Sequence, residues 1–82
     1  MHYVIVDVET TGGSPKQSKI TEIAMYKYDG SQIIDELISL INPEQPIPEF
    51  IVRLTGITNH MVAEAPKFYE LAKDILSFCD GC

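Results

Sequence analysis

The chain has 82 residues, 45% of them hydrophobic, and its 12 acidic and 6 basic side chains give a net charge of −6. This composition predicts one small folded domain, and the negative charge argues against a protein that holds nucleic acid by phosphate neutralisation alone. No run approaches the roughly 20 apolar residues of a membrane span, and the first residues lack a signal-peptide pattern, so we expect a cytoplasmic protein with no membrane partner.

The first predicted element is an apolar strand that ends in two acidic residues. Residues 3–6 read Tyr-Val-Ile-Val, and residues 7–12 read Asp-Val-Glu-Thr-Thr-Gly. Because side chains alternate along a strand, Asp7 and Glu9 point to the same side of it. Two adjacent carboxylates offer only oxygen donors, which favours a hard divalent cation such as Mg2+ or Mn2+. Apolar residues on both faces predict a central strand over residues 3–8, covered on both sides.

The next two predicted elements are strands joined by a hairpin. Breaker residues fill the loop over residues 12–18, and Lys16 and Lys19 are interpreted as solvated lysines of this loop. Residues 20–28 and 32–41 are typical of strands, and Asp29-Gly30 between them is a strong hairpin signal. The first three strands should therefore form an antiparallel meander.

Helices follow the prolines at positions 43, 46 and 48. Pro48 fits the first turn of a short helix over residues 48–54, closed by Thr55-Gly56, and Thr58 is expected to cap another short turn. A longer helix should run between Pro66 and Gly81, with one apolar face buried against the sheet. The two cysteines, Cys79 and Cys82, are too few to complete a zinc site, so we interpret Cys79, near the end of this helix, as a buried thiol. The apolar face consists of Phe68, Leu71, Ala72, Ile75, Leu76 and Cys79.

These motifs resemble, in the same order, those of the DEDD-type 3′-to-5′ exonucleases, especially the proofreading subunits and domains of bacterial DNA polymerase III. Residues 6–12 are similar to the first motif of the family, and residues 20–24 to its second strand. The likeness continues through residues 40–48, the Leu-Thr-Gly-Ile-Thr-Asn segment at 54–59, and residues 62–66. It implies an α+β unit, the N-terminal portion of an α/β ribonuclease-H-like exonuclease fold, with a three-stranded antiparallel meander plus helices.

The resemblance also implies an activity and a site. Asp7 and Glu9 would be catalytic ligands of two Mg2+ or Mn2+ ions, and hydrolysis would release nucleoside monophosphates. Backbone amides around Thr10, Thr11 and Gly12 would hold the terminal nucleotide of a single-stranded 3′ end of DNA or RNA. DNA polymerase subunits are the other implied partners. The pocket for the base and sugar would be lined by Leu54, Thr55, Gly56 and Ile57.

Simpler interpretations stay open for this last group. Gly56 can equally be a helix stop, and Leu54 and Ile57 can be core residues.

The family uses four acidic residues and a general base, and the later motifs that supply the other acids and the base have no counterpart here. We therefore expect residues 1–82 to be the N-terminal part of one exonuclease domain, truncated before those motifs and inactive alone. Without its later neighbour, the strand over residues 3–8 would have an open apolar edge. We expect this edge to cause self-association, strengthened by divalent cations.

Two alternatives belong to other classes of protein. Haloacid-dehalogenase-type phosphatases also place an Asp-x-Asp-x-Thr motif after an apolar strand, but that fold continues into parallel β-α units, whereas the Asp29-Gly30 hairpin predicts an antiparallel neighbour. The other alternative is a non-catalytic fragment or interaction module, which the absence of the remaining carboxylates supports.

Overall fold

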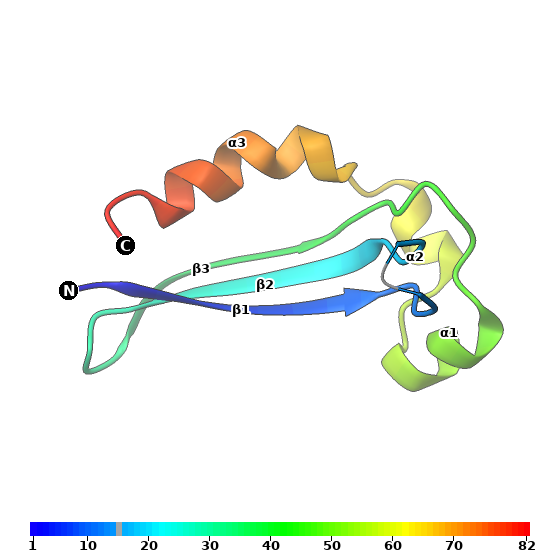
Figure 1. Cartoon of the computed structure of the whole chain (residues 1–82), viewed down its shortest axis with the longest axis horizontal. Helices are drawn as coiled ribbons and strands as arrows, with labels where there is room; N and C mark the ends of the chain where they lie inside the picture. Colours follow the sequence, from blue (N-terminus) through cyan, green and yellow to red (C-terminus); the bar gives the residue numbers. More distant parts are fainter. Residues whose placement is uncertain (15) are drawn as a thin grey trace.

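The computed structural model describes residues 1–14 and 16–82, so that Pro15, in the loop predicted over residues 12–18, lies outside the described residues. Three strands precede three helices (Figure 1). None of the helices in the described residues has both the length and the apolar character needed to cross a bilayer. The elements are β1 (Tyr3–Thr10), β2 (Ile20–Tyr28), β3 (Ile33–Leu40), α1 (Glu49–Thr55), α2 (Asn59–Ala63) and α3 (Phe68–Cys79).

The strands form one antiparallel sheet in the order β1-β2-β3, which confirms the predicted meander. In the turn between β2 and β3, the Asp29 N–H donates to the Gln32 carbonyl, and Gly30 has a φ of 98° that an L side chain rarely adopts. The carboxylate of Asp29 accepts the N–H groups of Ser31 and Gln32, both at 2.8 Å. These bonds lower the pKa of Asp29 below its ordinary value, the one from Gln32 most strongly. The antiparallel pairing contradicts the phosphatase alternative.

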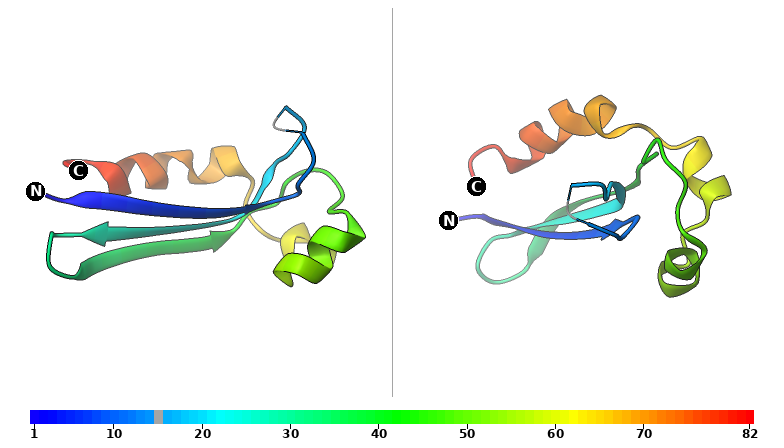
Figure 2. Two further views of the ribbon diagram at one scale, coloured as in Figure 1. Left: turned by 60° about the horizontal axis from the view of Figure 1, so that its bottom comes forward. Right: turned by 45° about the vertical axis from the view of Figure 1, so that its right-hand side comes forward.

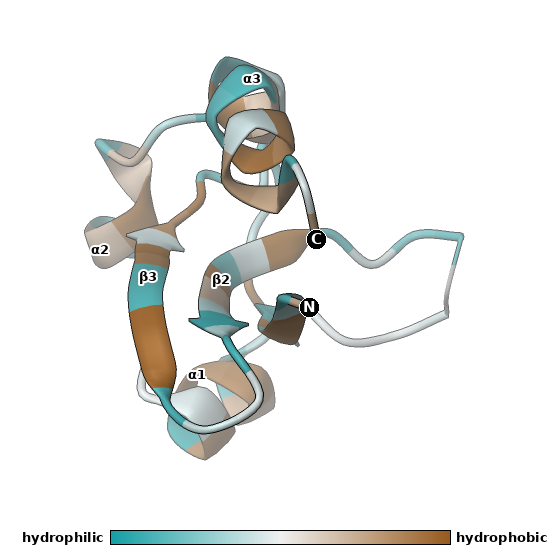
Figure 3. Ribbon diagram, turned by 90° about the vertical axis from the view of Figure 1, so that its left-hand side faces the viewer, coloured by the Kyte–Doolittle hydropathy of each residue, from teal (hydrophilic) through white to brown (hydrophobic). Residues whose placement is uncertain are grey.

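Helix α3 runs back along one face of the sheet, which brings the two chain termini to the same end of the molecule (Figures 1 and 2). Apolar segments of β2, β3 and α3 are visible end-on in Figure 3. Ile23 and Met25 of β2 pack with Ile41 and with Phe78 of α3, and these four side chains form the main core. The side chain of Lys27 lies over the Phe78 ring, with its Nζ 4.8 Å from the ring centroid.

The prediction that β1 is buried on both faces is wrong for this chain. β1 is an edge strand, and Ile5 and Val6 are 51% and 53% exposed. Val4 is the one described residue of β1 that packs against the main core, whose other strand side chains come from β2 and β3. No described element covers the opposite face of the sheet (Figures 1 and 2).

The predicted apolar face of α3 needs a similar correction. Leu71 and Ile75 pack on the core as expected, but Leu76 is 73% exposed and Phe68 is also exposed. Phe78 takes the buried position, and Cys79 is only half-buried. The contact therefore follows the positions i, i+4, i+7 and i+8 from Leu71, so that Cys79 packs as predicted while Phe68 and Leu76 lie outside the contact.

The two short helices pack at the end of the sheet where β1 and β3 leave it. Ile47, Ile51, Ile57 and Val62 form a second buried cluster there. Helix α1 begins after Pro48, one residue later than predicted, and ends at Gly56 in the left-handed conformation with a φ of 79°. The Thr58 side chain accepts the Met61 N–H, which confirms Thr58 as the cap of α2. His60 of α2 is exposed.

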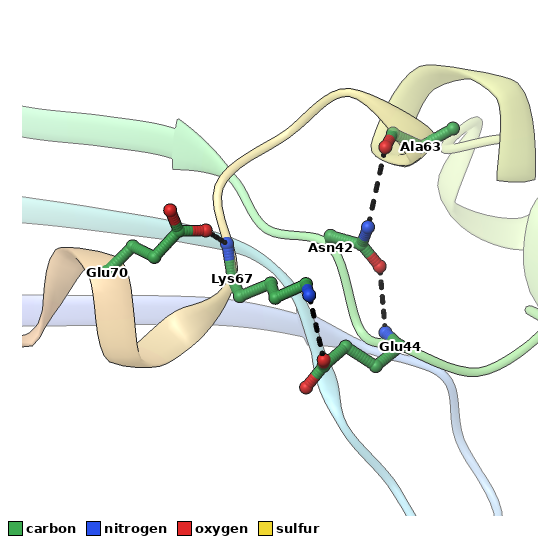
Figure 4. Close-up of polar contacts among 5 residues, drawn as sticks. All are labelled: Asn42, Glu44, Ala63, Lys67 and Glu70. Carbon is green, nitrogen blue, oxygen red and sulfur yellow. Dashed lines mark hydrogen bonds and ion pairs between the residues drawn. The ribbon is translucent and has the colours of Figure 1, made fainter.

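Polar contacts fix the start of α3 beside the exit of β3 (Figure 4). Asn42 and Lys67 form an isolated parallel β-bridge. The side-chain oxygen of Asn42 accepts the Glu44 N–H at 2.8 Å. The Lys67 ammonium lies 3.4 Å from a carboxylate oxygen of Glu44, and this hydrogen bond is the main reason why the pKa of Lys67 is raised. Glu70 accepts the Lys67 N–H at 2.9 Å and so closes the first turn of the helix.

Candidate active site

The two candidate metal ligands lie on the face of the sheet that α3 leaves uncovered. Val6 and Val8 of β1 pair with Met25 and Ile23 and share the face that α3 covers. Asp7 and Glu9 alternate with them and therefore point to the open face. Asp7 is exposed and Glu9 is half-buried. The prediction that both carboxylates share one face at the exit of the strand is confirmed.

A third carboxylate on the same face escaped the sequence analysis. Glu22 of β2 is the direct cross-strand partner of Glu9, so the two side chains project to one side. Like charges placed directly opposite each other destabilise an antiparallel pair. The placement of Glu22 follows from the register between β1 and β2, which the motif of a single strand does not contain.

The chemistry of these donors fits a divalent cation without completing its coordination. Carboxylate oxygens are the ligands that Mg2+ and Mn2+ prefer, and such ions take about six of them. Within residues 1–14 and 16–82, no group of three or more His, Cys, Asp or Glu side chains is placed to hold a metal ion. Asp7 and Glu9 therefore supply fewer oxygen ligands than such an ion takes.

The turn after β1 is built from internal hydrogen bonds. The Thr11 N–H donates to the Lys19 carbonyl at 2.8 Å, and the Gly12 N–H donates to the Thr10 hydroxyl at 3.1 Å. Thr11 is 2% exposed, and its hydroxyl accepts the Lys19 N–H and the Gln45 side-chain amide. The amides of Thr11 and Gly12 are thus used within the fold, and the turn is rigid scaffold for the carboxylates.

Gly12 joins this turn to α1. Its φ is 74°, and a Cβ on it would lie 2.7 Å from the Cδ1 atom of Ile51. Glycine is therefore required at this position both by the backbone conformation and by the close approach of the helix. Gly13, the next residue, has a φ of 87° but open space around its Cα.

The predicted base pocket divides into structural and exposed residues. Thr55 donates its hydroxyl to the Ile51 carbonyl and accepts the Ile57 N–H, while Gly56 caps α1 and Ile57 belongs to the second cluster. The simpler interpretations of Gly56 and Ile57 are therefore confirmed as structural roles. Leu54 is 79% exposed, so its alternative as a core residue is wrong.

Sequence reasoning missed two residues that belong to this end of the molecule. Phe50 is exposed on α1 four residues before Leu54, so both apolar side chains lie on one face of the helix. The spacing is a readable signal, although the pattern alone does not say that this face is outside the core. Gln45 donates to Thr11 and to the Gln17 carbonyl, and only the folded chain brings these residues together.

A cavity of about 580 Å3 lies beside the turn. Gly12, Gly13 and Gln45 line it together with Lys16 and Lys19. The two lysines, predicted to be solvated loop residues, are indeed exposed but border this hollow.

Solved structures define the class of protein. Exonuclease X in complex with 5′ overhanging duplex DNA superposes with a TM-score of 0.77 and is 29% identical, over 88% of this chain and 42% of that one. The nuclease domain of 3′hExo, a DEDDh family member bound to rAMP, gives a TM-score of 0.79 at 25% identity, over 94% of this chain and 42% of that one. The fold is therefore the ribonuclease-H-like fold of the DEDDh exonucleases.

Sequence comparison shows the family. The family model described as Exonuclease (RNase_T) matches residues 4–82, and this chain belongs to that family. It is 42% identical over 80 residues to the 3′-5′ exonuclease DinG of Bacillus subtilis, which covers 96% of this chain and 9% of the relative. It is 45% identical over 71 residues to the PolC-type DNA polymerase III of Bacillus cereus, which covers 87% of this chain and 5% of the relative. The chain thus spans less than a tenth of the length of either relative.

Proposed function

We propose that this chain forms the N-terminal, metal-binding part of a 3′-to-5′ exonuclease of the proofreading type. The observation that carries the proposal is the pair Asp7 and Glu9 on the uncovered face at the exit of β1, in a chain of the exonuclease family. Mg2+ or Mn2+ held there would supply activation of a water and stabilisation of the leaving 3′ oxygen. The substrate is a single-stranded 3′ end of DNA, with RNA as the alternative, and the cytoplasm is its setting.

The residues of the chain have distinct parts in this proposal. Asp7 and Glu9 would hold the ions through their carboxylate oxygens. The turn over Thr10, Thr11 and Gly12 holds these carboxylates in place through its internal hydrogen bonds. The exposed apolar side chains of Phe50 and Leu54 provide a surface for the terminal base.

The electrostatics of the site support binding of the nucleotide only when the cation is present. The chain has a net charge of −6, which repels phosphate, and a bound divalent ion reverses the sign locally. Lys16 and Lys19, which line the cavity beside the turn, would assist as cations. DNA polymerase subunits are the proposed protein partners, since the matched PolC-type relatives are polymerases.

The complete site requires more ligands than Asp7 and Glu9. Two carboxylates supply only a few of the roughly six oxygens around each ion. Because catalytic groups that act together lose most of the rate when some are absent, residues 1–82 alone should release no measurable mononucleotide. Release by this chain alone from single-stranded DNA or RNA, abolished by Asp7→Asn, would contradict this part of the proposal.

Cation binding can be tested on the chain itself. Titration with Mn2+ should broaden the NMR signals of Asp7, Glu9 and Thr10 before all others, and Asp7→Asn should remove this selectivity. Broadening that starts elsewhere and is unchanged by Asp7→Asn would show that the cation site is not at the exit of β1.

Activity can be tested by segment exchange with a relative. This chain would replace the matching segment of the PolC-type polymerase of Bacillus subtilis, to which it is 42% identical over 72 residues. The hybrid should release mononucleotides from a 3′ end, and Asp7→Asn should lower that rate by about 1,000-fold or more. Glu22→Gln is the matched control, a carboxylate lost from the same face, and should cost less than about tenfold. Equal losses in both variants would overturn the assignment of Asp7 as a ligand.

A further inference from the structure

The cavity beside the turn after β1 lies between two segments of this chain. One wall is the loop between β1 and β2, and the other is the segment that leads from β3 to α1. The volume of about 580 Å3 falls within the range of roughly 300–1,000 Å3 that is typical of sites for small ligands. Neither wall belongs to the edge of β1, so the cavity does not depend on what lies beside that strand. The loop wall includes Gly12, Gly13, Lys16 and Lys19, and the other wall consists of Gln45, Pro46 and Pro48.

Hydrogen bonds of Gln45 hold the two walls together. Its side-chain amide donates to the Thr11 hydroxyl at 2.8 Å and to the Gln17 carbonyl at 2.9 Å. The backbone of Lys19 is fixed from the same side, because its carbonyl accepts the Thr11 N–H and its own N–H donates to the Thr11 hydroxyl. The loop that carries the lysines is thus held in place before a ligand binds, which lowers the entropic cost of binding.

The charge of the cavity is opposite to that of the whole chain. The chain has 12 acidic and 6 basic side chains, yet the described residues that line the cavity include two lysines and no carboxylate. Lys16 and Lys19 are exposed, and the one ion pair within residues 1–14 and 16–82 joins Lys67 to Glu44 instead. Glu44, the residue before Gln45, is turned toward Lys67, 3.4 Å away (Figure 4). The cavity therefore favours an anion.

Phosphate is the anion that this arrangement suits. A lysine ammonium has three donors and is a common ligand of phosphate. Gly13 leaves the backbone open to close approach, since no atom lies within 4 Å of a Cβ placed on it. Helix α1 lies on the side of the sheet opposite α3 (Figures 1 and 3), so the wall before α1 leads to the side on which Asp7 and Glu9 project.

We propose that Lys16 and Lys19 bind, in this cavity, a phosphate of the substrate strand other than the one that is hydrolysed. This inference rests on the proposed function, in which Asp7 and Glu9 hold the cations at the reacting phosphodiester. Thr11, on the cavity, follows Glu9 by two residues, which is about 7 Å along an extended chain. One phosphate cannot occupy both places, so the cavity takes a neighbouring phosphate and contributes to binding of the strand.

Phosphate binding can be measured on the chain without any divalent cation. In the presence of EDTA, a dinucleotide of two thymidines with a single phosphodiester should shift the NMR amide signals of Gly13, Lys16 and Lys19 before all others. Thymidine alone, which has no phosphate, should leave these signals unchanged. Shifts that begin elsewhere, or no shifts at all, would overturn the proposal. Shifts caused by inorganic phosphate but not by the dinucleotide would overturn the assignment to a nucleic acid strand.

Two variants of equal net charge separate the cavity from the overall charge of the chain. The double variant Lys16→Gln, Lys19→Gln and the control Lys73→Glu each lower the net charge of −6 by two units. Lys73 is exposed on α3 and does not line the cavity. With the circular dichroism spectra unchanged, the dinucleotide shifts should disappear in the double variant and persist in Lys73→Glu. Equal loss in both variants, or shifts retained by both, would overturn the proposal.

The hybrid with the PolC-type polymerase of Bacillus subtilis measures the consequence for the reaction. The double variant should raise KM for a single-stranded 3′ end and leave kcat unchanged, as expected for a contact made equally before and in the transition state. The slope of log(kcat/KM) against log salt concentration should become shallower by about 0.7, the value for one phosphate of a single strand. An unchanged KM and slope would overturn the proposal. The dinucleotide titration needs neither a cation nor catalysis, so its failure is distinct from a failure of the proposed function, in which Mn2+ would not bind at Asp7.

Discussion

The exit of strand β1 and the rest of the strand differ in how completely the chain encloses them. At its exit, the strand runs into a turn where Thr11 is buried, Gly12 contacts Ile51, and Gln45 holds the loop. Along its length, the same strand is an edge with about half of Ile5 and Val6 exposed. The candidate metal ligands lie at the junction. One side of the site is therefore enclosed by the turn, and the other side is open surface.

The largest expected effect is at the closed end, in Gly12→Ala. The added Cβ would overlap the Ile51 side chain at 2.7 Å and would sit on a backbone with a φ of 74°. We expect a loss of about 3 kcal/mol in the free energy of unfolding, from overpacking and left-handed strain together. Urea denaturation followed by circular dichroism measures it. Gly13→Ala, with a φ of 87° but no neighbouring atoms, should cost clearly less. Equal costs would mean that the close approach of Ile51 to Gly12 adds nothing to the cost of the substitution.

The next effect is the loss of the hydrogen bonds around Thr11. Thr11→Val removes the acceptor of the Lys19 N–H and of the Gln45 amide while keeping the shape of the side chain. A buried donor left unsatisfied costs about 1–3 kcal/mol, and we expect about 2 kcal/mol here. Gln45→Ala should cost about 1 kcal/mol. The double variant, measured in the same denaturation assay, should cost less than the sum, because both changes remove one shared bond. Additive costs would contradict the coupling.

A gain in stability is expected inside the sheet. Thr21 is 1% exposed, and its hydroxyl oxygen has no hydrogen-bond partner among the described residues. Thr21→Val replaces an unsatisfied polar group by an apolar one of the same shape and should raise the free energy of unfolding by about 1 kcal/mol. Thr58→Val is a useful contrast, since that hydroxyl caps α2 and its loss should destabilise by a similar amount. A destabilised Thr21→Val chain would show that the hydroxyl is satisfied in solution.

The smallest effect concerns the hairpin turn far from the closed end. The pKa of Asp29 is lowered by its bonds from the Gln32 and Ser31 amides, so its stabilising effect is present above its ordinary pKa of 3.8. This effect is lost as the pH falls through the lower, folded pKa. The melting temperatures of the unmodified chain and of Asp29→Asn should differ slightly at neutral pH and converge below pH 3.8. A difference that widens in acid would contradict the direction of the pKa shift.

Local patterns in the sequence were sufficient for most elements. The hairpin at Asp29-Gly30, the cap at Thr58 and the acidic pair at the end of β1 depend on residues close in the chain, and the structure confirms all three. The same holds for α3, whose bounds follow from Pro66 and Gly81. Its buried stripe was harder to predict, because Leu76 and Phe78 are both apolar and only the crossing of the helix over the sheet selects Phe78.

By itself, the sequence determined the family, the antiparallel meander and the placement of Asp7 and Glu9 on one face, since strand period and turn chemistry are local properties. Only the tertiary structure decided which groups are free to act. It joins Thr11 to Gln45 across 34 residues, places Gly12 against Ile51, and assigns Ile57 to the core while leaving Leu54 exposed. It also leaves β1 at an edge. Burial and long-range contacts depend on which segments meet in space, and the strand pattern of β1 is the same with a neighbour on one side or on both.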